Sequence, residues 1–333
     1  MGHRRVLVTG GQGYVGSVLT ALLACAGSQV VVVDNGMVPG AQLDAPGVSY
    51  LTGDVRDVGP WEDALDRVDA VVHLAAVVGD PACGVDPQLA LQTNYLGTIN
   101  VAEACRRHGV RRMVFASTCS NYGLADDDRE LDIWSPLNPQ SGYAESKILA
   151  EHYLLSSQAS DFTPYILRFA TLHGLSPRMR FDLAVNVMTA QAVQEGRVVV
   201  HGGRQWRPFL HVRDAARAVQ RTLAADLGPG ARIYNCGSSP ENYRLDTVAA
   251  IIAREVPGTA VSVRPDAADH RNYRVNFDRL ARDLSFAPEH RLAGSVRELV
   301  AALRRGDFPD FRDTRHSNVL IAREFAARHR TLV

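Results

Sequence analysis

Lysine is almost absent from this chain of 333 residues. Lysine and arginine together number 36, yet Lys147 is the only lysine. Where charge alone matters, arginine can replace lysine, so a position that keeps lysine indicates a need for a compact ammonium with rotating donors. The sequence therefore marks Lys147 as a candidate functional residue.

Net charge and long apolar runs are also missing. The 36 basic side chains are balanced by 36 acidic ones, which predicts no nucleic-acid partner and no attraction to an anionic membrane surface. No run approaches the roughly 18 apolar residues that cross a bilayer. The first strand-like segment begins so early that we also expect no signal peptide.

Cysteine pairs with metal-site or redox spacing are absent as well. The five cysteines are odd in number and contain no C-x-x-C pair, and the histidines show no metal-ligand spacing. This pattern predicts reduced thiols in the cytoplasm and argues against a disulfide framework or a bound metal ion.

The N-terminal half alternates short β-branched runs with segments of helix length. The runs VLVTG and VVVVD are apolar on both faces, as in a parallel sheet covered by helices on two sides. We therefore predict an α/β fold with a Rossmann-type, doubly wound parallel sheet. The predicted strands are Arg5–Thr9, Gln29–Asp34, Ala70–Leu74, Met113–Ser117 and Thr163–Phe169. The predicted helices are Tyr14–Ala26, Pro87–Arg107 and Tyr143–Ser157.

From about Gly174 the pattern changes to short segments rich in arginine, proline and glycine. We interpret residues 1–173 as a dinucleotide-binding domain, to which the chain returns around 211–236. Residues 174–210 and 237–310 are expected to form a smaller C-terminal α/β domain that binds the substrate. For the tail, 311–333, the sequence leaves open an extra helix or an arm for assembly. Helices are predicted in this half over Phe181–Glu195, Val212–Ala225, Tyr243–Glu255 and Gly294–Arg304.

A glycine motif lies between the first strand and the first helix. Gly10, Gly13 and Gly16 have the spacing G-x-x-G-x-x-G, which allows a tight turn and close approach of a pyrophosphate to the backbone. Asp34 ends the second strand, where a carboxylate accepts hydrogen bonds from the adenosine ribose and repels a 2′-phosphate. The motif therefore predicts NAD, rather than NADP, as the cofactor.

Tyr143 and Lys147 occupy positions i and i+4 of a predicted helix, so they share one face. A free tyrosine has a pKa of about 10, but a neighbouring ammonium and a nicotinamide cation favour the phenolate, which makes the pair a usable acid and base. Such a pair alone also fits a surface contact. Ser117 and Thr118 end a predicted strand and are expected in the ligand crevice, although alone they also fit a polar turn.

These segments together resemble the extended short-chain dehydrogenase/reductases, in particular the NAD-dependent nucleotide-sugar epimerases and dehydratases of the UDP-glucose 4-epimerase type. The resemblance runs through TGGQGYVG, GDVRD, HLAA, TNYLGT, STCSNYG, YAESK, RFATLHG and WRPFLHVRD. It implies that Tyr143 is the acid/base, Lys147 its partner and Thr118 the hydroxyl that binds the reacting sugar oxygen. Asn94 is expected to fix the helix that carries the active site.

Cofactor contacts are expected at the glycine turn and at the carboxyl ends of the predicted strands. Asp54 and Val55 are expected at the adenine edge, although Asp54 alone also fits a cap or turn. The full set is Gly10, Gly13, Tyr14, Val15, Gly16, Asp34, Asn35, Asp54, Val55, Leu74, Ala75, Ala76, Asn94, Ser117, Tyr143, Lys147 and Phe169.

The resemblance also implies a nucleotide-diphosphate sugar as the substrate. Arg207 is expected at the diphosphate together with a second arginine, for which Arg271 is the better match and Arg264 the alternative, because guanidinium forks suit diphosphate oxygens. Two positions depart from the family pattern: Thr171 replaces an amide that contacts the diphosphate, and His173 replaces an aromatic residue near the nicotinamide. The expected substrate contacts are Thr118, Cys119, Ser120, Tyr143, Thr171, Asn186, Arg207 and Arg271.

The residues after Thr118 distinguish the activities within this resemblance. Sugar 4,6-dehydratases carry an Asp-Glu pair there, whereas this chain has Cys119 and Ser120, neither of which is an obvious acid for loss of water. We therefore expect a 4-epimerase, which oxidises the sugar transiently and returns the hydride to the opposite face. A ketosugar reductase, a dehydratase and a dinucleotide-binding protein without catalysis remain alternatives, and Cys119 is either an acid/base or a wall residue. The resemblance further implies a homodimer built from helices 87–107 and 143–157.

Overall fold

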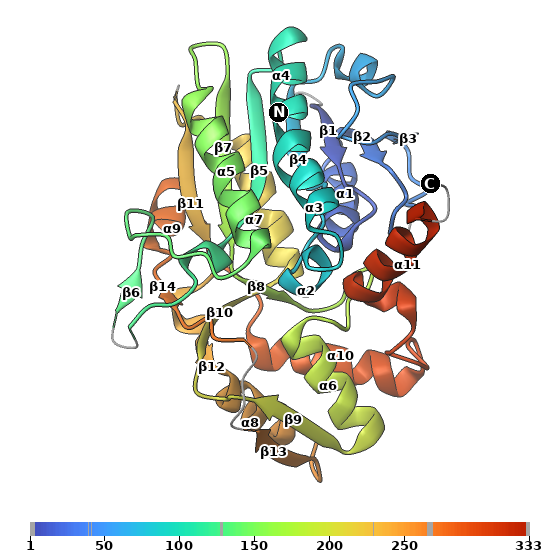
Figure 1. Ribbon diagram of the computed structural model, residues 1–333, viewed down its shortest axis with the longest axis vertical. Coiled ribbons are helices and arrows are strands. Elements are labelled where there is room, and N and C mark those ends of the chain that lie inside the picture. The colour runs from blue at the N-terminus through green and yellow to red at the C-terminus, as the bar shows by residue number, and fades with distance from the viewer. Residues whose placement is uncertain are drawn as a thin grey trace.

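A central parallel sheet organises the molecule (Figure 1). The structure, a computed structural model, describes residues 4–38, 40, 42–126, 129–228, 230–264 and 269–330. Within these residues the sheet has seven strands in the order β11-β7-β5-β4-β1-β2-β3, which confirms the predicted Rossmann-type topology. The strands are β1 (Arg5–Thr9), β2 (Gln29–Asp34), β3 (Val48–Thr52), β4 (Ala70–His73), β5 (Arg112–Thr118), β7 (Thr163–Phe169) and β11 (Arg232–Cys236).

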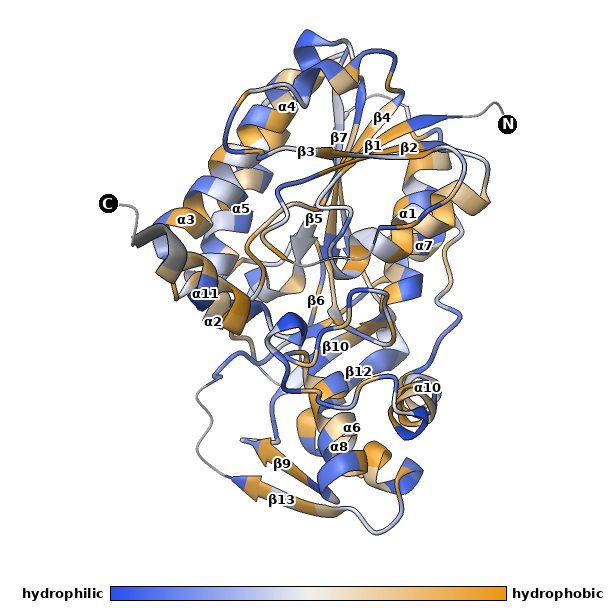
Figure 2. Ribbon diagram, turned by 90° about the vertical axis from the view of Figure 1, so that its right-hand side faces the viewer, coloured by the Kyte–Doolittle hydropathy of each residue, from blue (hydrophilic) through white to orange (hydrophobic). Residues whose placement is uncertain are grey.

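Alternate side chains of every strand of this sheet except β3 enter two separate cores. Val6 and Val8 of β1 pack with helices α1 and α7 on one face, whereas Leu7 packs with α4 and α5 on the other. Figure 2 shows these two helix pairs on opposite sides of the sheet. The strands are therefore apolar on both faces, as predicted. The helices of this part are α1 (Tyr14–Cys25), α2 (Asp80–Cys83), α3 (Pro87–Leu91), α4 (Gly97–Arg107), α5 (Gly142–Ser156) and α7 (Val212–Ala224).

One predicted helix is interrupted. The segment expected to be continuous from Pro87 to Arg107 consists of α3, a π-helical turn at Gln92–Leu96, and α4. Turns of this kind widen the helix by one residue and often occur at functional sites. Here the turn contains the buried side chain of Asn94.

A smaller part packs below the carboxyl ends of the strands around its own core (Figure 1). Its described strands form small sheets in the orders β12-β10-β8, β13-β9 and β14-β6. They are β6 (Glu130–Leu131), β8 (Thr171–His173), β9 (Arg197–His201), β10 (Trp206–His211), β12 (Asn242–Arg244), β13 (Ala260–Arg264) and β14 (Arg274–Val275). The remaining helices are α6 (Ala184–Glu195), α8 (Leu245–Glu255), α9 (Asp278–Leu284), α10 (Leu292–Arg305) and α11 (Asn318–Arg330).

Some helix boundaries differ from those predicted. Helix α6 begins at Ala184 instead of Phe181, because a loop that contacts α1 through Gly174 and Ser176 extends to Leu183. Tyr243 belongs to β12, so α8 begins at Leu245. The tail contains a helix, α11, which packs against α2. Strand β11 does join the central sheet by pairing with β7. Among the described residues no helix is long and apolar enough to span a bilayer.

Candidate active site

The glycine turn after β1 requires glycine at two positions. Gly10 has a φ of +71°, and a Cβ there would lie 2.6 Å from the backbone nitrogen of Ala75. A Cβ on Gly16 would collide with the carbonyl oxygen of Gly10. The turn opens the N-terminus of α1 toward the ends of β1 and β4, where the strand order reverses. This is the place where a dinucleotide pyrophosphate binds in sheets of this type.

Asp34 lies at the end of β2 beside the glycine turn. Its carboxylate accepts hydrogen bonds from the backbone nitrogens of Gln12 (3.1 Å) and Gly36 (3.0 Å). Burial raises the pKa of Asp34, and these two N–H groups oppose that rise. The carboxylate is thereby held in place with oxygen lone pairs left to accept hydrogen bonds from ribose hydroxyls.

Asp54 lies just outside the cavity, next to the lining residue Val55. Its carboxylate pairs with Arg56 (2.8 Å) and accepts a hydrogen bond from Asn35 Nδ2 (2.9 Å). Asn35 and Val55 line the cavity, whereas Asp54 does not. Its position fits a residue that orients the Asn35 side chain.

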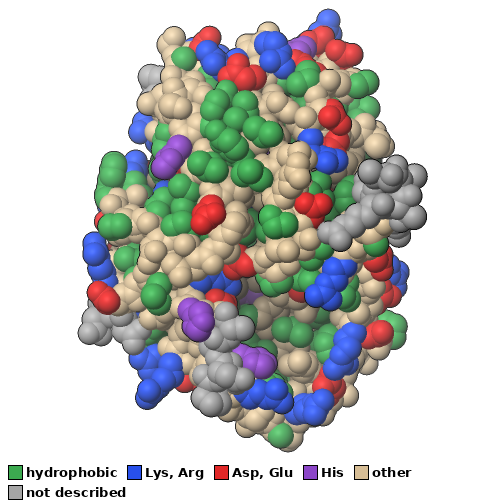
Figure 3. Space-filling view, viewed as in Figure 1, with side chains coloured by type: hydrophobic (Ala, Val, Ile, Leu, Met, Phe, Trp, Pro, Cys, Tyr) green, Lys and Arg blue, Asp and Glu red, His purple; other side chains and the backbone are tan. Residues whose placement is uncertain are grey.

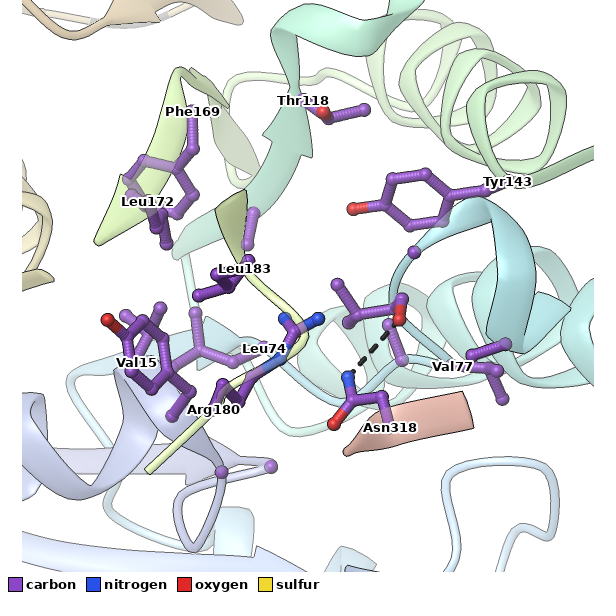
Figure 4. A pocket seen from close by; sticks show the side chains of 18 of the residues that line it. Val15, Leu74, Val77, Thr118, Tyr143, Phe169, Leu172, Arg180, Leu183 and Asn318 are labelled. Atoms are coloured by element: carbon purple, nitrogen blue, oxygen red, sulfur yellow. Dashed lines mark hydrogen bonds between the residues drawn. The ribbon is translucent and has the colours of Figure 1, made fainter. Parts of the chain in front are cut away.

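Tyr143 and Lys147 lie on the first turns of α5, and Thr118 ends β5 opposite them. All three line one cavity, and the Tyr143 hydroxyl points into it beside Thr118 (Figure 4). Burial raises the pKa of Tyr143, while the charge of Arg180 and a hydrogen bond with Thr118 lower it. Without a ligand the phenol therefore keeps its proton, and a further positive charge nearby is needed to release it.

Lys147 is almost completely buried, with 3% of its surface exposed. Its Nζ donates a hydrogen bond to the carbonyl oxygen of Ala116 (2.9 Å) and lies 4.7 Å from the centre of the Phe115 ring. Burial lowers the pKa of Lys147 to about 8. The bond to Ala116 uses one of three donors, so the ammonium is fixed and can still bind a ligand in the cavity.

A buried ion pair holds α5 against the sheet. Glu151, one turn beyond Lys147, accepts hydrogen bonds from Arg168 of β7, with an Nη2–Oε2 distance of 2.6 Å. Ser117 donates to the same carboxylate at 2.5 Å. Separating the two partners would leave a buried charge uncompensated, which costs folding free energy. The pair therefore fixes α5 relative to β5 and β7.

Asn94 connects the π-helical turn to α5. Its Nδ2 donates to Ser146 Oγ (3.1 Å) and to the carbonyl oxygen of Val77 (3.0 Å), and its Oδ1 accepts from the Val77 nitrogen (2.8 Å). The side chain does not line the cavity. Its contacts are those of a residue that positions the helix carrying Tyr143.

Two arginines of the smaller part meet around one carboxylate. Arg271 donates to both oxygens of Asp269, at 2.8 and 2.6 Å, and Arg207 forms an ion pair with one of them at 3.0 Å. Arg271 Nη1 also binds Asp80 of α2 (2.8 Å) and Ser120 Oγ (3.2 Å). Burial by itself would raise the pKa of Asp269, but the hydrogen bond from Arg271 and the charge of Arg207 hold it well below its usual value. These guanidinium groups are therefore neutralised by carboxylates of the protein itself.

A cavity of about 570 Å³ joins the glycine turn, Asp34, the Tyr143 pair and the two arginines. Four of the predicted contact residues are absent from its lining: Asp54, Asn94, Cys119 and Asn186. The predicted residues that line it are Gly10, Gly13, Tyr14, Val15, Gly16, Asp34, Asn35, Val55, Leu74, Ala75, Ala76, Ser117, Thr118, Ser120, Tyr143, Lys147, Phe169, Thr171, Arg207 and Arg271.

Cys119 and Asn186 are buried behind the cavity wall. The Cys119 thiol lies 3.2 Å from the carbonyl oxygen of Arg168, and burial raises its pKa far above the ordinary value, so it stays protonated. Asn186 holds a loop: its Oδ1 accepts from Gly174 N (3.0 Å), and its Nδ2 donates to Arg180 O (2.8 Å).

Two further predicted positions lie elsewhere. His173 does not line the cavity; it is buried next to His211, with ring centres 5.6 Å apart. Burial lowers the pKa of His173, which is therefore neutral. Arg264, the alternative to Arg271, is exposed at the end of β13.

Sequence reasoning missed several residues that line the cavity. Arg178 and Arg180 come from the loop before α6, and Asp80 begins α2. Asn318 and Val319 come from the start of α11. The Asn318 side chain donates to the carbonyl oxygen of Val78 at 3.2 Å (Figure 4). The segment PRMR was visible in the sequence, but in so arginine-rich a chain nothing distinguished it from surface charge.

The doubly wound sheet, the glycine turn and the buried Tyr143/Lys147 pair define an extended short-chain dehydrogenase/reductase. The chain belongs, more specifically, to the NAD-dependent epimerase/dehydratase family, whose model matches residues 6–237. The family's NAD dependence agrees with the cofactor predicted from the glycine motif and Asp34.

Known relatives of this chain include both epimerases and dehydratases. It is 30% identical to a UDP-glucose 4-epimerase of Azospirillum brasilense, over 89% of this chain and 91% of that protein. It is 28% identical to a dTDP-glucose 4,6-dehydratase of Actinoplanes, over 90% of this chain and 98% of that protein. Among solved structures, MoeE5 in complex with UDP-glucuronic acid and NAD superposes with a TM-score of 0.80 at 28% identity, covering 91% of this chain and 99% of that one.

Proposed function

We propose that this protein is an NAD-dependent nucleotide-sugar 4-epimerase. The observation that carries the proposal is the composition of the single cavity around Tyr143. Thr118 lies beside Tyr143 there, and the position that follows Thr118 holds a buried, protonated thiol, Cys119, instead of an acid. A relative named UDP-glucose 4-epimerase supports the same substrate class.

Each of these residues has a separate role in the proposed reaction. Thr118 orients the sugar hydroxyl, and Tyr143, driven toward phenolate by Lys147 and the cofactor's cationic ring, accepts its proton. NAD supplies the hydride acceptor and, in its reduced form, the hydride donor. If the 4-keto sugar rotates so that its other face receives the hydride, Tyr143 would return the proton to the sugar oxygen. The net change is inversion at C4 with no net oxidation.

The experiment that tests this proposal follows the product and the cofactor together. The purified protein is incubated with UDP-glucose, dTDP-glucose and UDP-glucuronic acid, and the sugars are analysed by NMR and mass spectrometry. We expect a C4 epimer of unchanged mass and no net consumption of NADH. A product formed only with stoichiometric NADH oxidation contradicts the proposal and identifies a ketosugar reductase. Binding of NAD without any turnover identifies a dinucleotide-binding protein.

A dehydratase is the second candidate, and Asp80 is the observation that favours it. Its carboxylate lines the cavity and adds to the burial that raises the pKa of Tyr143, so it lies within electrostatic reach of the acid/base. A product that has lost one water molecule, and that disappears in Asp80→Asn, would assign this activity. An epimerase would keep its turnover in that variant.

We further propose that the protein forms a homodimer through α3, α4 and α5. Leu91, Leu96 and Leu149 on these helices and the intervening turn are 44%, 47% and 43% exposed, and hydrophobic side chains gather over α4 and α5 (Figure 3). Burial of such residues favours association. The double variant Leu96→Glu/Leu149→Glu should sediment as a monomer, whereas a monomeric wild type would refute the dimer.

We propose the cytoplasm as the site of action, which cell fractionation would test.

A further inference from the structure

Arg178 is buried in the cavity wall without the partners that a guanidinium needs. Only 3% of its surface is exposed, and neither its Nε nor its Nη2 has a hydrogen-bond partner among the residues that the structure describes. The neighbouring Arg180, by contrast, forms two hydrogen bonds to Asp182, at 2.9 and 3.0 Å. Burying unpaired donors disfavours folding, so an arginine kept in this state indicates that a ligand supplies the missing acceptors.

The loop that carries Arg178 is fixed against the first turn of α1. The Tyr14 hydroxyl donates to the carbonyl oxygen of Gly174 (2.7 Å), and Ser176 Oγ donates to the carbonyl oxygen of Tyr14 (2.7 Å). Tyr14 directly follows Gly13 and is the first residue of α1. Arg178 lies within electrostatic reach of Arg180, Asp182 and the Tyr14 hydroxyl. The backbone two residues before Arg178 is therefore anchored at the first residue of α1.

The other end of the loop is equally well fixed. Asp182 holds Arg180 and also accepts a hydrogen bond from the backbone nitrogen of Asn318 (3.0 Å) at the start of α11. Phe181 N donates to the carbonyl oxygen of His316 (2.8 Å). Arg178 thus stands between two anchored points, and its side chain is presented to the cavity by a fixed backbone.

Two diphosphates would enter this cavity if the protein has the function proposed above, on which this inference rests. The substrate diphosphate has Arg207 and Arg271, whereas the cofactor pyrophosphate has the N-terminus of α1. We propose that Arg178 is the counter-charge for the pyrophosphate of the dinucleotide. The guanidinium fork donates to phosphate oxygens that the α1 backbone also binds, and this satisfies the nitrogens left unpaired in the protein.

Binding measurements on three variants test this assignment. Arg178→Gln removes the charge, Arg178→Lys keeps it without the planar fork, and Arg254→Gln, at a side chain 69% exposed on α8, is the matched control. Each variant, freed of nucleotide, is titrated with NAD, ADP-ribose, adenosine and UDP. We expect Arg178→Gln to bind NAD and ADP-ribose about 10- to 100-fold more weakly, with adenosine and UDP changed less than about twofold. Arg178→Lys should lie between, and the control should match the wild type.

Thermal unfolding supplies a readout that does not depend on activity. Because Arg178 lacks partners in the empty protein, Arg178→Met should unfold at the same temperature as the wild type or higher, yet be stabilised less by NAD. Unchanged NAD affinity in Arg178→Gln overturns the inference. So does weakened binding of UDP alone, or an equal loss for all four ligands together with a lower unfolding temperature. A wild type that fails to bind NAD would instead refute the proposed function itself.

Discussion

The two halves of the cavity handle charge in different ways. In the half around the glycine turn, the groups that line the cavity are backbone N–H donors, the carboxylate of Asp34, which is held by two backbone nitrogens, and the Arg178 guanidinium, which has no carboxylate bonded to it among the described residues. Around β10 and the segment before β14 the ligand groups are guanidiniums, and each is already paired: Arg207 with Asp269, and Arg271 with Asp269 and Asp80.

This difference implies two modes of binding. The dinucleotide half offers a largely preformed site, so a ligand there gains its hydrogen bonds without breaking others. In the half proposed to bind the substrate, a diphosphate would have to replace carboxylates that already hold the arginines. Affinity there is the difference between two sets of charged contacts, and therefore depends on Asp80 and Asp269 as well as on the arginines.

The largest expected effect is a loss of turnover that leaves the affinity for the cofactor nearly unchanged. Tyr143→Phe should lower turnover by about 10³-fold, since it removes the acid/base, while NAD affinity changes less than a few-fold. Steady-state rates and NAD titration measure the two. Tyr153→Phe, on the same helix but bonded to Glu103, is the control and should keep its rate. Full activity of Tyr143→Phe would refute the mechanism.

The second prediction concerns Lys147, whose pKa is about 8 in the folded protein against an ordinary 10.5. Between these values the unfolded chain binds more protons than the folded one, so the free energy of unfolding of the nucleotide-free protein should rise with pH. The rise attributable to this group is about 3 kcal/mol. Urea unfolding from pH 7.5 to 10 measures it. Lys147→Met should lack this rise; parallel curves for the two proteins would contradict the assignment.

The third prediction tests the substrate half alone. Arg271→Gln should weaken UDP binding and raise KM by about 30-fold, because a fork to the diphosphate is lost, while NAD affinity stays the same. Calorimetric titration with UDP and with NAD distinguishes the halves. Arg264→Gln, at an exposed arginine of β13, is the matched control. If Arg264→Gln gives the larger loss, the second diphosphate ligand has been misassigned.

The smallest expected effect is on UDP binding, and it tests most directly the difference between the two halves of the cavity. Asp80→Asn removes one carboxylate that competes with the diphosphate for Arg271, so UDP should bind about threefold tighter, in the range of an exposed ion pair. NAD binding should be unchanged. Weaker UDP binding in this variant would mean that Asp80 presents Arg271 to the ligand instead of competing with it.

Sequence reasoning reached the parts of the site that local geometry determines. Gly10 and Gly16 belong to the turn after the first strand, and Asp34 ends the second strand. Tyr143 and Lys147 are one helical turn apart. The spacing in the sequence is therefore enough to predict that these residues lie in the site. The apolar strands of the central sheet were equally predictable. Strand β3 and the two- and three-residue strands of the smaller part were not, since short or half-exposed segments carry little periodicity.

The missed residues reach the cavity through long-range packing. Arg178 and Asn318 reach the cavity from a loop and from the start of α11, both more than 150 residues after the glycine turn, and no local spacing indicates this. Cys119 is adjacent to Thr118 in sequence, yet the turn after β5 buries it behind the wall. Which of many arginines is paired and which lacks a partner is likewise decided only by the fold.

The start of α11 contributes Asn318 and Val319 to the wall of the cofactor cavity. During synthesis, the glycine turn and the parallel sheet leave the ribosome long before these two residues do. The wall of the cavity is therefore incomplete while the N-terminal half folds. The full cavity forms only after α11 has packed against α2.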